Sequence, residues 1–90
     1  MPIDPDTVWR RIVHHSGQEC RQIRGKPFTY RARGRTIYLD TTNRMISRTA
    51  IEKALTRVPL RSTSDVQDLS APSYIYAILM DKRIRQSDWA

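Results

Sequence analysis

The stretch KPFTYRARGRTIYLD, residues 26–40, decides the fold, because it has the pattern of two short strands joined by a glycine turn. On both sides of Gly34, apolar or aromatic side chains alternate with polar ones. Successive side chains of a strand point to opposite faces of a sheet, so the alternation predicts a β-hairpin with one apolar face. We expect that inner face to carry Phe28, Tyr30, Ala32, Ile37 and Leu39.

A two-residue turn at Gly34 and Arg35 sets the register of this hairpin. Glycine at the first turn position suits a mirror-image turn, which needs a positive φ there. A turn at Arg33 and Gly34 is ranked second, because arginine disfavours the left-handed region. The preferred turn predicts the outer pairs Arg33 with Thr36, Arg31 with Tyr38 and Thr29 with Asp40, and the inner pairs Tyr30 with Leu39 and Ala32 with Ile37.

The residues before the hairpin predict a helix and a third strand. Asp4-Pro5 suits a helix start and Gly17 suits a helix end, so we expect a helix over residues 5–16. Residues 18–24 alternate poorly, which indicates a bulged or edge strand. The buried stripe of the helix is expected to be Val8, Trp9, Ile12 and Val13.

The residues after the hairpin predict a loop over 41–44 and then a second helix. Ser47 is placed as its N-cap, and Ile46 is expected to pack on Ile51 as a hydrophobic staple. Pro59 ends this helix. Its buried stripe is expected to be Ile51, Ala54, Leu55 and Val58.

Two further helices are expected toward the C-terminus. A capping-box pattern that begins at Ser64 predicts a short helix over residues 65–69. Pro72-Ser73 opens a final helix that runs to about Lys82, with a strand as the rival interpretation. Residues 74–80 are apolar on every side, so this helix is expected to be the most buried element. The fold class is therefore α+β in one domain, residues 1–90: an N-terminal helix, a small three-stranded antiparallel sheet over residues ~18–40, and two or three C-terminal helices.

Length and composition favour one small soluble domain. Ninety residues support a single modest core, and the mean hydropathy is −0.61. The longest apolar run, residues 74–80, is far shorter than the ~20 residues of a membrane helix. The N-terminal stretch lacks the pattern of a signal peptide, and the single cysteine, Cys20, excludes an intramolecular disulfide. We expect a cytoplasmic protein without a membrane partner.

Positive charge is concentrated in the middle of the chain. The net charge is +7, and residues 21–61 hold eleven Lys or Arg against two acids, a local excess of 11 − 2 = +9. Residues 62–90 hold three bases and four acids, a balance of −1. Such a distribution favours a polyanionic partner. Arginine outnumbers lysine thirteen to three, and this composition alone also gives a basic surface.

Catalytic and metal-binding motifs are missing from the sequence. There is no phosphate-binding glycine loop, no paired-cysteine motif and no nucleophile elbow. His14 and His15 are adjacent on a helix, so their rings point about 100° apart and do not share a metal easily. Cys20 is expected to fill the core. We expect no cofactor, no metal and no enzymatic activity.

A cluster of cations with one aromatic ring indicates a nucleic-acid-binding module, with DNA expected ahead of RNA. A tyrosine ring among arginines offers stacking together with phosphate contacts, and the helix start near Arg48 adds backbone N–H groups. A helix-turn-helix is rejected, because residues 65–69 are acidic and 74–80 apolar. The candidate residues are Arg31, Arg33, Arg35, Tyr38, Arg44, Arg48 and Lys53.

The alternative is a protein-interaction or assembly domain that binds an acidic protein surface without any nucleic acid. Tyr74, Tyr76 and Trp89 would supply its interface anchors. The runs over residues 46–55 and 72–84 resemble the fixed blocks of small bacterial domains. That resemblance points to no named family and assigns no residue a role.

Overall fold

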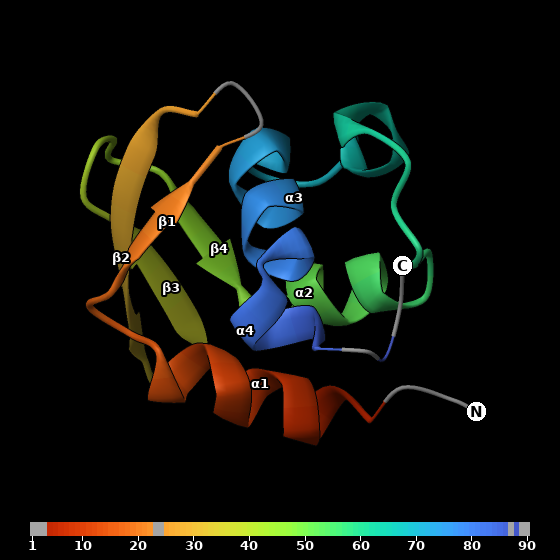
Figure 1. Ribbon diagram of the computed structural model, residues 1–90, viewed down its shortest axis with the longest axis horizontal. Helices are drawn as coiled ribbons and strands as arrows, with labels where there is room; N and C mark the ends of the chain where they lie inside the picture. Colours follow the sequence, from red (N-terminus) through yellow and green to blue (C-terminus); the bar gives the residue numbers. More distant parts are fainter. Residues whose placement is uncertain (1–3, 23–24, 87, 89–90) are drawn as a thin grey trace.

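A four-stranded antiparallel sheet with helices packed on one face forms the fold of the computed structural model, which describes residues 4–22, 25–86 and 88 (Figure 1). The strands pair in chain order, so the sheet is a simple meander. They are β1 (Glu19–Arg21), β2 (Pro27–Arg33), β3 (Thr36–Leu39) and β4 (Met45–Ser47). The helices are α1 (Pro5–His14), α2 (Arg48–Leu55), the 3₁₀ helix η1 (Thr63–Val66), α3 (Pro72–Met80) and α4 (Lys82–Arg85).

The predicted register of the β2–β3 hairpin is confirmed. Gly34 has a φ of 57° at the first turn position, as a mirror-image turn requires. The Thr29–Asp40 pair closes the far end: Asp40 N–H donates to the Thr29 carbonyl at 3.0 Å, and Asp40 Oδ1 accepts from Thr29 N–H at 2.8 Å. The remaining Cα partners are Arg33 with Thr36, Ala32 with Ile37, Arg31 with Tyr38, and Tyr30 with Leu39.

The prediction of three strands was wrong by one. Strand β4 pairs with β3, and Tyr38 is the partner of Met45. Ile46 is fully buried in the sheet, and therefore it does more than staple the start of a helix. Ser47 ends β4 and also caps α2, accepting a hydrogen bond from Ala50 N–H at 3.2 Å. The predicted N-cap is thus confirmed.

Helix α1 is shorter and narrower than predicted. It ends at His14 and not at residue 16, and Gly17, with a φ of 89°, lies in the turn that follows. Val8, Trp9 and Ile12 are buried as expected. Val13 is 45% exposed, because three buried positions already fill the strip of α1 that faces the core. Strand β1 covers only part of the predicted 18–24, of which residues 23–24 lie outside the described residues.

The C-terminal helices also differ in their limits. Helix α2 ends at Leu55, before the cis Val58–Pro59 bond. Ser62, and not Ser64, caps the short helix η1, so that helix begins earlier than predicted. The final helix breaks at Asp81, whose Oδ1 accepts from Arg83 N–H at 2.8 Å and so starts α4.

The core lies between the inner face of the sheet and the helices. Phe28, Tyr30 and Ile37 from the sheet are buried against apolar residues of α1, α2 and α3. Helix α3 is helical as predicted, and the rival strand interpretation was wrong. Helices α2 and α3 each bury four residues, but no residue of α3 is exposed, whereas α2 exposes Thr49 and Lys53, so α3 is the more buried of the two, as predicted. Its half-buried side chains are Tyr74, Tyr76 and Met80.

Candidate functional site

The face of the sheet opposite the helices carries three rows of side chains that run across the strands. We call it the outer sheet face. Its central row has two large apolar side chains that are exposed, Tyr38 at 42% and Met45 at 53%. The rows are Arg31–Tyr38–Met45, Arg33–Thr36–Ser47 and Glu19–Thr29–Asp40.

Two arginines and one tyrosine of this face surround a shallow hollow of about 290 Å³. Arg31 and Arg33 are both exposed on β2, and Tyr38 lies on the neighbouring strand β3. Arg35 is exposed in the adjoining turn. Among the described residues, none of these three arginines forms an ion pair. Their guanidinium groups therefore stay available to an anion.

Arg48 lies on the other side of the sheet from this hollow. Its Nε donates to Glu52 Oε2 at 3.0 Å, and its terminal nitrogen binds the carboxylate of Asp6. The guanidinium also lies over the Trp9 ring, 5.8 Å from the centroid. Only 18% of its side chain is exposed, and the hydrogen bond that its guanidinium donates to Asp6 raises its pKa further. Arg48 therefore joins α2 to α1.

The start of α2 has fewer unpaired backbone N–H groups for binding an anion than the sequence indicates. Arg48 N–H donates to the Arg35 carbonyl at 2.8 Å, and Ala50 N–H donates to Ser47 Oγ. Two of the first N–H groups of the helix are thus already paired. The first of these bonds ties the hairpin turn to the helix.

The two remaining candidate cations are exposed at different places. Lys53 lies on α2, near Asp68. The side-chain hydrogen bond from Arg57 is the main cause that lowers the pKa of Asp68, and the charge of Lys53 lowers it slightly more. Lys53 therefore lies on the helical side of the molecule. Arg44 immediately precedes Met45 and is exposed. Met45 was not among the predicted residues, because β4 was not predicted.

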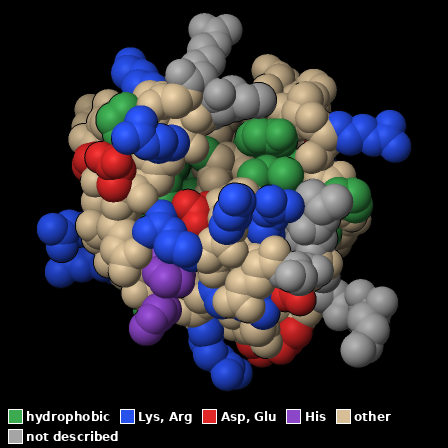
Figure 2. All heavy atoms as spheres, in the orientation of Figure 1, with side chains coloured by type: hydrophobic (Ala, Val, Ile, Leu, Met, Phe, Trp, Pro, Cys, Tyr) green, Lys and Arg blue, Asp and Glu red, His purple; other side chains and the backbone are tan. Residues whose placement is uncertain are grey.

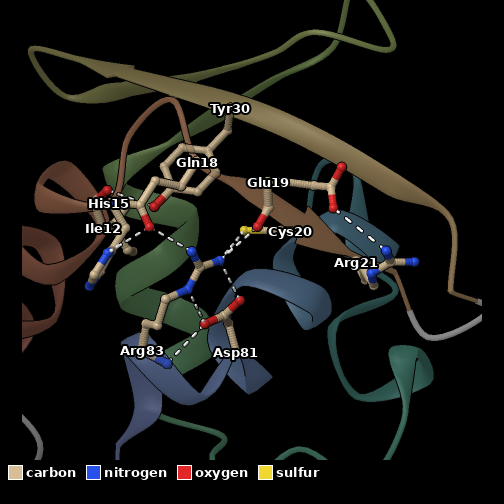
Figure 3. A network of polar contacts seen from close by, with 9 residues as sticks. All are labelled: Ile12, His15, Gln18, Glu19, Cys20, Arg21, Tyr30, Asp81 and Arg83. Carbon is tan, nitrogen blue, oxygen red and sulfur yellow. Dashed lines mark hydrogen bonds and ion pairs between the residues drawn. The ribbon is translucent and has the colours of Figure 1, made fainter.

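A second polar cluster joins the α3–α4 corner to the edge strand β1 (Figure 3). The guanidinium of Arg83 binds Asp81 at 2.9 and 3.0 Å, and it donates to the Glu19 carbonyl at 2.8 Å and to Gln18 Oε1 at 2.6 Å. Cys20 Sγ lies 3.6 Å from the same group. Burial, more than any neighbouring charge, raises the pKa of Cys20 to about 11. The thiol stays neutral near pH 7, so it is not poised as a nucleophile, and the prediction that Cys20 fills the core is confirmed.

Two other hollows flank this cluster. One, of about 350 Å³, lies between β1 and α3 and has Tyr76 and Met80 in its wall. The other, of about 370 Å³, is lined by Arg10 and by both histidines, which lie side by side at the lower left of Figure 2. The histidine rings meet edge to face with their centroids 4.9 Å apart. On the face shown in Figure 2, some Lys and Arg side chains project from several sides of the outline, and others gather near its centre around an acidic side chain.

Comparison of the chain with known proteins finds no matching family model, no matching curated protein and no matching solved structure. Within residues 4–22, 25–86 and 88, no three His, Cys, Asp or Glu side chains lie close enough to hold a metal ion together. In that same part of the chain, each helix is too short or too polar to cross a membrane. The outer sheet face has an exposed aromatic ring beside arginines that form no ion pair among the described residues. These groups are suited to binding an anion, so this face is the candidate site.

Proposed function

We propose that this protein binds nucleic acid through its outer sheet face, without catalysis. Arg31, Arg33, Arg35 and Arg44 contact phosphates, and Tyr38 lies between them. The observation that supports this role is the hollow in which two arginines and an exposed ring meet. Such a surface combines the charge and the aromatic face that nucleic-acid-binding proteins use.

The distribution of ion pairs supports this assignment. Most acids that pair with arginine lie in the helical layer, where they bind Arg11, Arg48, Arg57 and Arg83. On the sheet, Glu19 pairs with Arg21 at 3.6 Å. Asp40 accepts a backbone hydrogen bond from Thr29. The cations near Tyr38 are therefore left with little local compensation, which favours a polyanion.

A salt-titrated binding assay tests the proposal. Fluorescence anisotropy with labelled single strands and duplexes should show binding at ~50 mM salt, with log K falling by about 3 per unit log[salt] for a single strand and about 4 for a duplex if four cations contact phosphates. The double variant Arg31→Glu/Arg33→Glu should lose most of that affinity. The matched control, Arg61→Glu/Lys82→Glu, makes the same charge change at exposed residues away from the hollow. Equal losses in both variants, or no binding by the unmodified protein, would reject the proposal.

The second candidate function is a protein-interaction domain, favoured by the hollow between β1 and α3. Tyr76 and Met80 are half-buried there and offer an apolar wall. Tyr74 is a weaker anchor, because its ring packs on Phe28 and its hydroxyl bonds to Thr41. Trp89 lies outside the described residues. A mass that rises with concentration and persists at high salt would favour this role over nucleic-acid binding.

A further inference from the structure

We infer that the nucleic acid taken by the outer sheet face is a single strand, with one base stacked on the ring of Tyr38. This inference rests on the proposed function and specifies its ligand. It follows from the width of the sheet, from the anchoring of the hairpin turn, and from the neighbours of Tyr38.

The width of the sheet disfavours a duplex. Neighbouring strands lie about 4.8 Å apart, and the row through Tyr38 crosses the three strands β2, β3 and β4, so the backbone there spans about 10 Å before side chains are counted. The major groove of B-DNA is about 12 Å wide and admits a helix or a two-stranded ribbon. A three-stranded face with its side chains is therefore broader than the two-stranded ribbon that the groove admits.

The β2–β3 hairpin does not enter the groove by itself either. Strand β4 reaches the last pair before the turn, where Ser47 lies beside Thr36. On the other edge, Ala32 N–H donates to Ser16 Oγ at 2.9 Å, so the α1–β1 turn flanks β2. The turn itself is held by the 2.8 Å bond from Arg48 N–H to the Arg35 carbonyl. The hairpin is thus enclosed on both sides, with little of its tip free to project.

The surroundings of Tyr38 suit an unstacked base. Its cross-strand partners are Arg31 on one side and Met45 on the other, so a cation and an apolar side chain both lie one strand away. Tyr38 and Met45 are two of the three large apolar side chains that are exposed in the described residues. The core is filled by side chains on the inner face of the sheet and on the helices, and it contains neither Tyr38 nor Met45. A base stacked on the ring would have its phosphates within reach of the arginines, whatever the identity of the base.

Substitution of Tyr38 separates stacking from charge. Anisotropy is measured with a labelled 12-nucleotide single strand and with the matched duplex, as DNA and as RNA, for Tyr38→Ala and Tyr38→Phe. The unmodified protein should bind the single strand more tightly. Tyr38→Ala should weaken that binding about tenfold or more with an unchanged salt slope, and Tyr38→Phe should bind nearly as the unmodified protein does. Tyr38→Leu, which keeps apolar bulk without a ring, should show the same loss and replaces the alanine variant if that variant does not fold.

Each outcome decides one of the two proposals. Duplex binding as tight as single-strand binding would overturn the inference, as would equal effects of Tyr38→Ala and Tyr38→Phe. If Arg31→Glu/Arg33→Glu abolishes binding while Tyr38→Ala and Tyr38→Leu bind normally, the proposed function stands and the stacking role falls. If no nucleic acid binds at all, the proposed function itself fails.

Discussion

The guanidinium of Arg48 lies over the ring of Trp9, 5.8 Å from its centroid, and this contact joins the start of α2 to α1. Asp6, in the first turn of α1, and Glu52, one turn along α2, hold the same group in place. An arginine within the most basic part of the chain thus acts between two helices. The contact gives Arg48 a structural role that the cations proposed to bind nucleic acid do not share, and substitution of Arg48 tests that difference.

Arg48→Ala should lower the melting temperature by a few degrees and leave nucleic-acid affinity nearly unchanged. The substitution removes two ion pairs and the stacking on Trp9, none of which faces the hollow. Arg31→Ala is the matched control: it should leave the melting temperature nearly unchanged and reduce the salt slope of binding by about 1. Differential scanning calorimetry and anisotropy measure the two effects. The opposite pattern would place Arg48 in the binding site.

Tyr30→Phe should destabilise the fold by about 1–3 kcal/mol, because it leaves a buried carbonyl without its donor. The Tyr30 hydroxyl donates to the Ile12 carbonyl at 2.6 Å, near the C-terminal end of α1. Tyr30 is fully buried, and burial raises the pKa of its hydroxyl well above the usual range. Tyr38→Phe removes the same atom from an exposed ring and should change stability very little. Urea unfolding compares the two, and equal effects would mean that the bond to Ile12 contributes nothing.

Local pattern was enough to predict the hairpin, since alternation and a glycine turn are both contained in fifteen residues. It also placed Arg31, Arg33 and Tyr38 on one face, where the structure gathers them around a hollow. Strand β4 escaped prediction because three residues carry too little alternation, and Ile46 fits a helix staple equally well. Met45 was missed for the same reason.

The positions that sequence reasoning placed elsewhere depend on distant partners. Arg48 meets Asp6, 42 residues away, and no spacing rule connects them. The break between α3 and α4 depends on Asp81, which caps α4 and also binds Arg83. Arg83 in turn reaches Glu19, 64 residues away. Tertiary contacts of this kind decide where a helix ends and which cations remain free.

Cys20 should resist thiol reagents in the folded protein at pH 8. Burial raises the pKa of its thiol to about 11, and only 2% of the residue is exposed. The thiolate is the reactive species, so labelling by a chromogenic disulfide should proceed only as fast as the protein opens. In 6 M urea the same protein should react rapidly, which serves as the control. Fast labelling without denaturant would show that the β1 edge opens readily.

Asp81→Asn should reduce the loss of stability that acid causes. Partial burial alone would raise the pKa of Asp81, but hydrogen bonds from the Arg83 side chain and backbone outweigh it and lower the pKa. A carboxyl whose pKa is lower in the folded state stabilises the protein at every pH above its pKa in the unfolded chain, 3.8. That stabilisation is lost as the pH falls through the pKa of the folded state. Unfolding free energies between pH 2 and pH 6 should therefore depend less on pH in this variant.

The matched control for Asp81 is Asp68→Asn. The pKa of Asp68 is also lowered, chiefly by the side-chain hydrogen bond from Arg57. Its side chain is 63% exposed, against 16% for Asp81, so solvent screens the pair and its effect should be smaller. A larger effect at Asp68 would contradict the importance given to the Asp81–Arg83 cluster.

Gly34→Ala should destabilise the protein by about 1–2 kcal/mol, the amount by which a Cβ disfavours a left-handed residue. Gly34 has a φ of 57°, and an added Cβ would meet no atom within 4 Å, so backbone strain is the whole effect. Gly34→Asn should be milder, because asparagine tolerates positive φ better than alanine. Urea unfolding of both variants measures the difference. If alanine and asparagine behave alike, or if neither weakens the fold, the turn lies elsewhere, and the register that brings Arg31 beside Tyr38 would be wrong.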